Sequence, residues 1–129
     1  MPVCLFVGGK AMLVAAAGFT LSWTHSVEKV RWEEDWTLGR GGLLTLVEAR
    51  VQGSGAGMEI PDGAILKDGA WHYAPSLPPR TSIVLANSGA TGGGWRICGD
   101  GRCAEVGEAA GKPAEISACR EGGSASAAQ

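Results

Sequence analysis

The sequence predicts an all-β fold, either an antiparallel β-sandwich or a partly closed barrel built from hairpins. The 129 residues include 21 glycines and six prolines, which divide the chain into many short apolar runs. No run has the length and period of a useful amphipathic helix. We expect a single all-β domain over residues 1–119 and a disordered tail over residues 120–129, which are small and polar.

Turn signals place the predicted strands and join several of them as hairpins. A turn is expected at Gly8-Gly9-Lys10, another at Gly39–Gly42, and a two-residue turn at Asp68-Gly69. The predicted strands are residues 3–7, 12–16, 19–27, 30–38, 43–51, 64–67, 70–74, 81–88, 95–98 and 103–106. The first two strands overlap a segment that resembles a poor secretory signal, but the lack of basic charge in the first nine residues favours the hairpin.

The clearest alternation of apolar and polar residues lies in the segment 19–38, which predicts two paired strands. With Glu28-Lys29 as a two-residue turn, Trp23 faces Glu34 and His25 faces Trp32. One face is then apolar and the other carries Thr, Ser and charged side chains. His25 and Glu34 are the two exceptions on the apolar face, and this register makes them diagonal neighbours.

A histidine and a carboxylate between Trp23, Trp32 and Trp36 form the first candidate site. In a desolvated pocket the pair could act as acid and base or as two ligands of a bound molecule. The alternative is structural, because a buried carboxylate needs a hydrogen-bond donor and an imidazole supplies one. Ser26 lies on the other face of the strand, so it is not positioned as the nucleophile of a simple dyad.

Two other segments are candidate sites. The loop Gly53–Met58 could offer backbone N–H groups to an anion, but Glu59–Gly63 does not permit the helix that dinucleotide binding requires. In Trp71-His72-Tyr73 the two aromatic residues share a face and the histidine points to the other. The spacing brings no set of metal ligands together, so no metal and no cofactor is predicted.

The four cysteines predict two disulfides rather than reduced thiols. Cys98 and Cys103 flank Gly-Asp-Gly-Arg and would lie opposite each other in a hairpin, and a bond between Cys4 and Cys119 would join the two ends of the domain. Such bonds favour an oxidising compartment. The net charge of −2 gives no case for nucleic acid or an anionic membrane, and the longest stretch of low charge is too short to span a bilayer.

Several segments in order resemble the bacterial domain-of-unknown-function family numbered 1850. They are FTLSWTHSVEKVRWEEDW, LVEARVQGSGAGME, DGAWHYAP and GGGWRICGDGRC, within a similarity that runs from Cys4 to Cys119. The resemblance implies a small protein without an established activity, often encoded beside tripartite ATP-independent periplasmic transporters. Many relatives carry an N-terminal signal or anchor, which this sequence does not obviously have.

Together these observations predict a non-enzymatic binding or accessory module of a periplasmic solute-uptake system, which contacts a transporter component or a small organic acid. A periplasmic location is favoured by the cysteines and by the resemblance. The alternatives are a small hydrolase or lyase with a His25–Glu34 dyad, and an interaction domain that uses Arg31, Glu33 and Asp35. The predicted ligand-binding residues are His25, Ser26, Glu28, Trp32, Glu34, Trp36, Gly55, Ala56 and Gly57.

Overall fold

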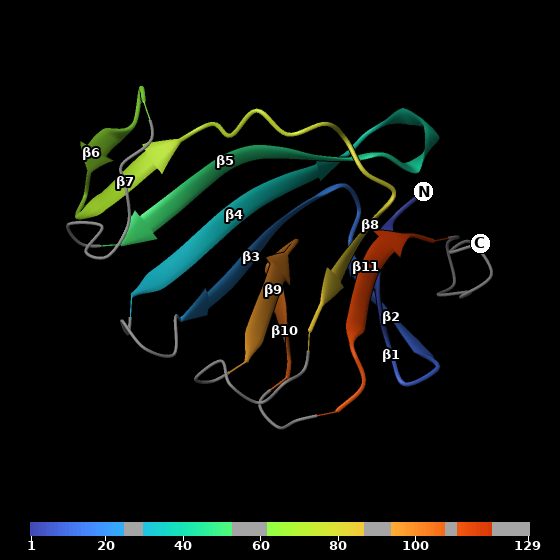
Figure 1. Cartoon of the computed structure of the whole chain (residues 1–129). Coiled ribbons are helices and arrows are strands. Elements are labelled where there is room, and N and C mark those ends of the chain that lie inside the picture. Colours follow the sequence, from blue (N-terminus) through green and yellow to red (C-terminus); the bar gives the residue numbers. More distant parts are fainter. Residues whose placement is uncertain (25–29, 53–61, 87–93, 108–110, 120–129) are drawn as a thin grey trace.

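The computed structural model describes residues 1–24, 30–52, 62–86, 94–107 and 111–119. This part of the chain contains eleven strands and one short 3-10 turn, η1 (Arg40–Gly42) (Figure 1). The strands are β1 (Val3–Val7), β2 (Lys10–Ala15), β3 (Gly18–Thr24), β4 (Arg31–Leu38), β5 (Leu44–Gln52), β6 (Ile65–Lys67), β7 (Ala70–Tyr73), β8 (Ser82–Leu85), β9 (Trp95–Gly99), β10 (Arg102–Val106) and β11 (Ala114–Ala118).

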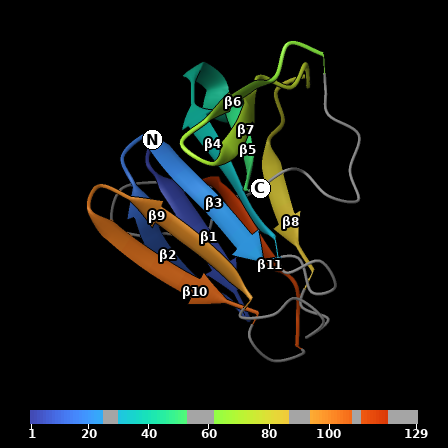
Figure 2. The same cartoon turned by 90° about the vertical axis from the view of Figure 1, so that its left-hand side faces the viewer.

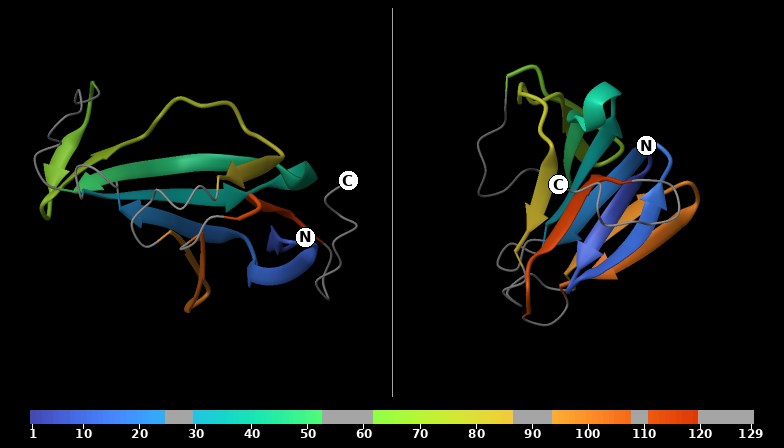
Figure 3. Two further views of the ribbon diagram at one scale, coloured as in Figure 1. Left: turned by 60° about the horizontal axis from the view of Figure 1, so that its bottom comes forward. Right: turned by 90° about the vertical axis from the view of Figure 1, so that its right-hand side faces the viewer.

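The strands form two antiparallel sheets that pack as a sandwich (Figure 2). The large sheet has seven strands in the order β10-β9-β3-β4-β5-β7-β6, and the small sheet has four in the order β2-β1-β11-β8. The sandwich predicted from the sequence is therefore confirmed, and the sheets do not close into a barrel. The end of the large sheet that carries β6 and β7 extends well past the small sheet (Figure 3).

The core lies between the small sheet and strands β3, β4, β5 and β9 of the large one. Its fully buried side chains include Leu5 and Ile116 from the small sheet and Leu21, Leu44 and Ile97 from the large sheet. Leu21 and Ile97 alternate with polar or more exposed residues along their strands, as expected for strands with one buried face. In β1, by contrast, Val3, Cys4 and Leu5 are fully buried in succession. Among the described residues no helix is long and apolar enough to cross a membrane.

The turns at Gly8-Gly9 and Asp68-Gly69 are confirmed as two-residue hairpin turns. Val7 pairs with Lys10 and Lys67 pairs with Ala70, and both central residues of each turn have positive φ. Positive φ at both positions is the requirement of the turn type that matches the twist of a hairpin, which is why glycine and aspartate occur there.

The strand β11 was missed by the sequence prediction. Its sequence AEISA has one β-branched residue among small and polar ones, so local propensity is weak. Even so, it lies between β1 and β8 near the centre of the small sheet, and Ala114 and Ile116 are fully buried. Pairing with two neighbours and burial of one face overrode the weak local preference.

The register predicted for β3 and β4 is wrong by two residues. Trp23 pairs with Trp32 rather than with Glu34, and Glu34 pairs with Leu21. The predicted Glu28-Lys29 turn lies outside the described residues. A shift of two residues keeps every side chain on its face, since the period of a strand is two, so the alternation could not detect the error.

The strand β5 contains an irregularity that the sequence left open. Leu44 and Leu46 are buried, and so are Ala49 and Val51, which lie at odd positions instead of even ones. The register against β4 shifts between these pairs, and Val47 is 52% exposed. The extra residue lets both halves of the strand turn their apolar side chains toward the same face.

Both predicted disulfides are present. Cys98 and Cys103 pair directly in the β9–β10 ladder, with Cα atoms 4.1 Å apart, and Cys4–Cys119 has a Cα separation of 5.7 Å. The bonds enclose segments of very different length, with sequence separations of 5 and 115 residues. The loop-entropy model gives stabilisations of about 2 and about 5 kcal/mol, respectively, so Cys4–Cys119 is the main covalent support of the fold.

Candidate functional site

Four tryptophans lie in line across the inner face of the large sheet, the face turned toward the small sheet. Trp95 of β9 pairs with Trp23 of β3, and Trp23 pairs with Trp32 of β4. Val51 of β5 pairs with Trp32 on one side and with Trp71 of β7 on the other. We refer to Trp95, Trp23, Trp32 and Trp71 as the tryptophan row.

Three rings of the tryptophan row contact one another, those of Trp23, Trp32 and Trp95, and all four residues are only half-buried. Trp23 and Trp32 are nearly parallel, at 8°, with ring centroids 6.1 Å apart. Trp23 and Trp95 are tilted by 52°, with centroids 5.0 Å apart. Such pairs stabilise a sheet across its strands. The remaining exposure of all four rings distinguishes them from the core leucines beside them.

The indole N–H groups of the inner face differ in their hydrogen bonding. Trp95 Nε1 donates to the carbonyl oxygen of Ala86 at 3.1 Å, and Trp36 Nε1 donates to Glu34 at 3.0 Å. The Nε1 atoms of Trp32 and Trp71 are buried and find no acceptor among the described residues. Buried donors without an acceptor are uncommon and destabilise the fold, so these two N–H groups are candidates to bind an acceptor from outside the described structure.

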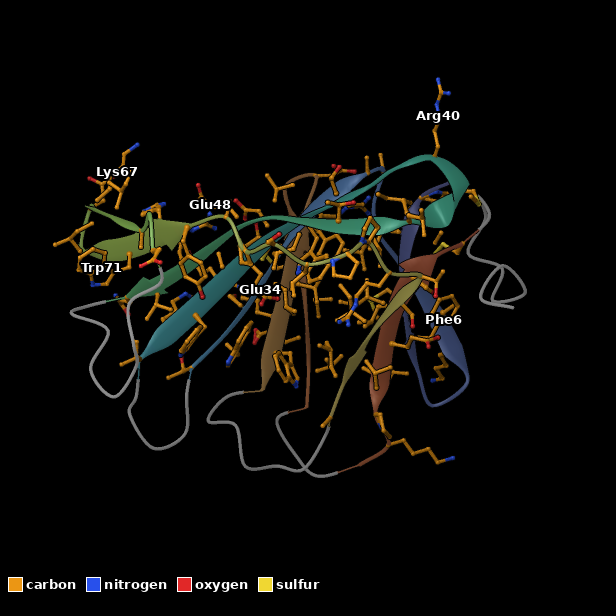
Figure 4. All side chains as sticks on the ribbon, turned by 45° about the horizontal axis from the view of Figure 1, so that its top comes forward. Phe6, Glu34, Arg40, Glu48, Lys67 and Trp71 are labelled. Atoms are coloured by element: carbon orange, nitrogen blue, oxygen red, sulfur yellow. A yellow bond between two sulfur atoms is a disulfide. The ribbon has the colours of Figure 1, made fainter. Side chains whose placement is uncertain are left out.

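Glu34 lies two residues from Trp32 along β4, so its side chain is on the same face as the tryptophan row. It pairs with Leu21 and with Ala49, and Ala49 pairs with Tyr73, so the carboxylate of β4 and the phenol of β7 flank Ala49 of β5 on the same face. Figure 4 shows Glu34 and Glu48 on opposite sides of the large sheet, and Trp71 at its far end. A carboxylate in this apolar setting is the main polar exception of the inner face.

The environment changes the acidity of both groups. Burial raises the pKa of Glu34, and the hydrogen bond from Trp36 and the positive charge of Arg80 only partly offset this. The pKa of Tyr73 is also raised, first by burial and then by the negative charge of Glu34. Glu34 therefore holds a proton more readily than an exposed glutamate does.

The outer face of the large sheet carries a cluster of charged groups that satisfy one another. Arg50 donates to Asp35 at 2.7 Å, to Glu48 at 2.8 Å and to Glu33 at 3.0 Å, and its side chain is 18% exposed. Arg31 donates to Glu33 and Ser22, and His72 lies 3.0 Å from Glu48. We refer to Arg31, Glu33, Asp35, Glu48, Arg50 and His72 as the charge cluster.

Arg50 controls the electrostatics of the charge cluster. Its hydrogen bonds lower the pKa of Asp35 and of Glu48, and His72 adds to the effect on Glu48. Partial burial would raise the pKa of Glu33, but the bonds from Arg50 and Arg31 outweigh it and lower that pKa. The hydrogen bond with Asp35 in turn raises the pKa of Arg50, so the guanidinium group stays protonated. The cluster joins β4, β5 and β7 by charge-assisted hydrogen bonds.

The structure brings together some of the residues predicted for the site. Trp32, Glu34 and Trp36 share the inner face, but Trp36 is 5% exposed and belongs to the core, where its indole holds Glu34. The diagonal relation of His25 and Glu34 depended on the register that proved wrong, and the donor found on Glu34 is Trp36. The predicted residues outside the described part of the chain are His25, Ser26, Glu28, Gly55, Ala56 and Gly57.

Sequence reasoning did not connect Trp71, Tyr73 and Trp95 with Trp32 and Glu34. The alternation in AWHY predicted correctly that Trp71 and Tyr73 share a face. However, the order of strands in the sheet was open, so nothing indicated that β7 and β9 lie on either side of the β3–β5 unit. His72 meets Glu48 on the outer face, and among the described residues no group of three or more His, Cys, Asp or Glu side chains is arranged to hold a metal ion.

A comparison with protein families shows which family the chain belongs to. The model of the family described as Domain of unknown function (DUF1850) matches residues 19–106. The chain belongs to this family. The DUF1850 match is narrower than the similarity seen in the sequence: it spans β3 to β10 and therefore the whole large sheet, but not β1, β2 and β11. Neither the search of curated proteins nor that of solved structures found a match.

Proposed function

We propose that this DUF1850 protein is a non-enzymatic binding module of a tripartite periplasmic solute-uptake system, and that it binds a small organic acid on the inner face of its large sheet. The observation that carries the proposal is the pair of buried indole N–H groups of Trp32 and Trp71 without acceptors in the described structure. The link to a transporter rests on the family resemblance, which also allows a transporter component as the partner.

The chemistry of the inner face favours a ligand that is rich in acceptors. A carboxylate has two oxygens that accept hydrogen bonds and none that donates, so it complements indole N–H groups. Aromatic rings next to these donors provide apolar surface for the carbon skeleton of the acid. The positive charge of Arg80, which acts on Glu34, adds an attraction for an anion.

Glu34 gives the proposed binding a characteristic dependence on pH. An anion bound nearby is repelled by the ionised carboxylate but not by the protonated one, so binding and protonation of Glu34 favour each other. Affinity for an acid that stays ionised should therefore increase as the pH falls toward the raised pKa of Glu34. Glu34→Gln should bind more tightly at neutral pH and lose this dependence.

The first experiment is a fluorescence titration of the full chain with small mono- and dicarboxylic acids, each compared with its amide. Trp71→Phe keeps an aromatic ring but removes the N–H, and should weaken binding about fivefold, the equivalent of about 1 kcal/mol. The matched control is His72→Asn, on the same strand but the opposite face, which should leave affinity unchanged. Equal binding of acids and amides, or an equal loss in both variants, would contradict the proposed contact.

A second experiment concerns the site residues outside the described structure. His25, Ser26, Glu28 and the loop Gly55–Gly57 remain part of the proposed site on the sequence argument. His25→Ala should weaken acid binding about tenfold or more, or 1.4 kcal/mol, with the melting temperature nearly unchanged. Native mass spectrometry of protein purified gently from its own source should detect a bound small acid. A bare mass together with no response to any acid would rule the proposal out.

A further inference from the structure

The two disulfides differ sharply in their access to solvent. Cys4 and Cys119 are both 0% exposed. Cys103 is exposed and Cys98 is half-buried, on the last two strands at one edge of the large sheet. A thiolate must reach a sulfur atom to break a disulfide, so access separates a reactive bond from a structural one. The same chain therefore contains an accessible disulfide and a buried one for comparison.

The backbone, and not the S–S bond, holds Cys98 and Cys103 together. They are a directly opposed pair, with Ile97–Ala104 on one side of them and Gly99–Arg102 on the other. Two further contacts fix this hairpin: β9 pairs with β3, and the carboxylate of Asp100 accepts a hydrogen bond from the backbone N–H of Ala16 at 2.8 Å. The two sulfur atoms should stay adjacent after reduction, so the bond can open and close without unfolding of the domain.

A hollow of about 190 Å³ lies beside Cys103, where the edge of the small sheet meets the edge of the large one. Two of its apolar side chains, Met12 and Leu13, are 52% and 47% exposed. The other residues that line it are Val14, Ile97, Arg102 and Ala104. Ile97 and Ala104 face the core, so by alternation Cys98 and Cys103 project from the opposite face of the hairpin, and the edge strand β10 lies between the S–S bond and the hollow. A protein partner that contacts this edge strand can place a thiol on one side of it and an apolar segment on the other.

We propose that Cys98–Cys103 is a site of thiol–disulfide exchange with a partner protein that carries an accessible dithiol and seats an apolar segment in the hollow. A thiolate of the partner attacks Cys103 Sγ, because Cys103 is the more exposed residue, and Cys98 leaves as a thiolate that takes up a proton. The second thiol of the partner then attacks its own sulfur in the mixed disulfide. Cys103 is released as a thiol, so the pair gains two electrons and two protons, and the partner is oxidised to a disulfide.

The test begins with the oxidised full chain under native conditions. The protein is treated with a graded series of dithiothreitol, the thiols are alkylated, and the labelled cysteines are identified by mass spectrometry. Cys98 and Cys103 should be labelled at least about tenfold faster than Cys4 and Cys119. With glutathione in place of the dithiol, the mixed disulfide should form on Cys103. Equal labelling of both pairs, or an adduct mainly on Cys98, would overturn the proposed site.

The docking part is tested with a purified oxidoreductase of the Cys-X-X-Cys type. Met12→Ser combined with Leu13→Ser should slow reduction by this enzyme about fivefold or more and leave reduction by dithiothreitol unchanged. Val84→Ser is the matched control, because Val84 is 64% exposed on the outer face of the small sheet, and it should change neither rate. Identical enzyme rates in all three proteins would overturn the role of the hollow.

Discussion

The two faces of the large sheet differ in whether their polar groups find hydrogen-bond partners. On the outer face the three carboxylates of the charge cluster are all hydrogen-bonded to Arg50. On the inner face the tryptophan row has two buried donors without acceptors among the described residues, and Glu34 has a raised pKa. The comparison shows that the region with most charges is not the one with unmet interactions, and unmet interactions are the better guide to a binding site.

The largest effect is expected from the centre of the charge cluster. Arg50→Met removes the cation and leaves Glu33, Asp35 and Glu48 to repel one another, so the free energy of unfolding should fall by about 2 kcal/mol. This is less than for a fully buried pair, because the carboxylates are partly exposed. Urea unfolding measures the loss, and Arg50→Lys, which keeps the charge but not the geometry, should lose about half as much. A loss below about 0.5 kcal/mol in Arg50→Met would mean that the cluster is only a solvated surface.

A second effect concerns the pH dependence of stability on the outer face. The carboxylates of Glu33, Asp35 and Glu48 have pKa values below the ordinary 4.5 for glutamate and 3.8 for aspartate. Their contribution is therefore present above those values and is lost as the pH falls through the lower values of the folded state. After discounting for exposure we expect a loss of about 1 kcal/mol, measured by unfolding at pH 6 and below pH 4. This acid dependence should be much weaker in Arg50→Met; an unchanged dependence would assign it to other groups.

Glu33 and Glu34 are neighbours in sequence, and they allow a direct contrast between the faces. Burial raises the pKa of Glu34, so its effect on stability is reversed: the fold is favoured below the ordinary pKa and loses stability as the pH rises through the raised one. Glu34→Gln should stabilise the protein by about 0.5 to 1 kcal/mol at pH 7 and change little at pH 3. Glu33→Gln should instead destabilise it at pH 7. The same sign for both variants would remove the contrast.

The smallest effect is expected for the indole donors without acceptors. Trp32→Phe and Trp71→Phe lose apolar surface but also remove an unsatisfied buried N–H group, so thermal unfolding should shift little, within about 0.5 kcal/mol. Trp95→Phe breaks the bond to Ala86 and should cost about 1 kcal/mol more than either. Equal costs in all three variants would indicate that the donors of Trp32 and Trp71 are satisfied in solution.

Much of the fold followed from local patterns in the sequence. The glycine and aspartate turns, the hairpin of Cys98 and Cys103, and the faces of β3, β4 and β7 were all predicted correctly. The two-residue error in the register of β3 and β4 changed no face, but it moved Glu34 from Trp23 to Leu21. That error bears on the predicted site, because the proximity of His25 and Glu34 had been inferred from this register, and His25 itself lies outside the described residues. The interruption in β5 and the strand β11 also depended on partners distant in sequence.

The sequence by itself determined which side of each strand is apolar and where most hairpins turn. These properties follow from a period of two residues and from backbone angles that glycine and aspartate adopt readily. Only the tertiary structure decided the order of the strands, the offset between them and the place of β11. Those choices depend on which distant surfaces can be buried together, and they are what placed Trp71 and Trp95 in line with Trp23 and Trp32.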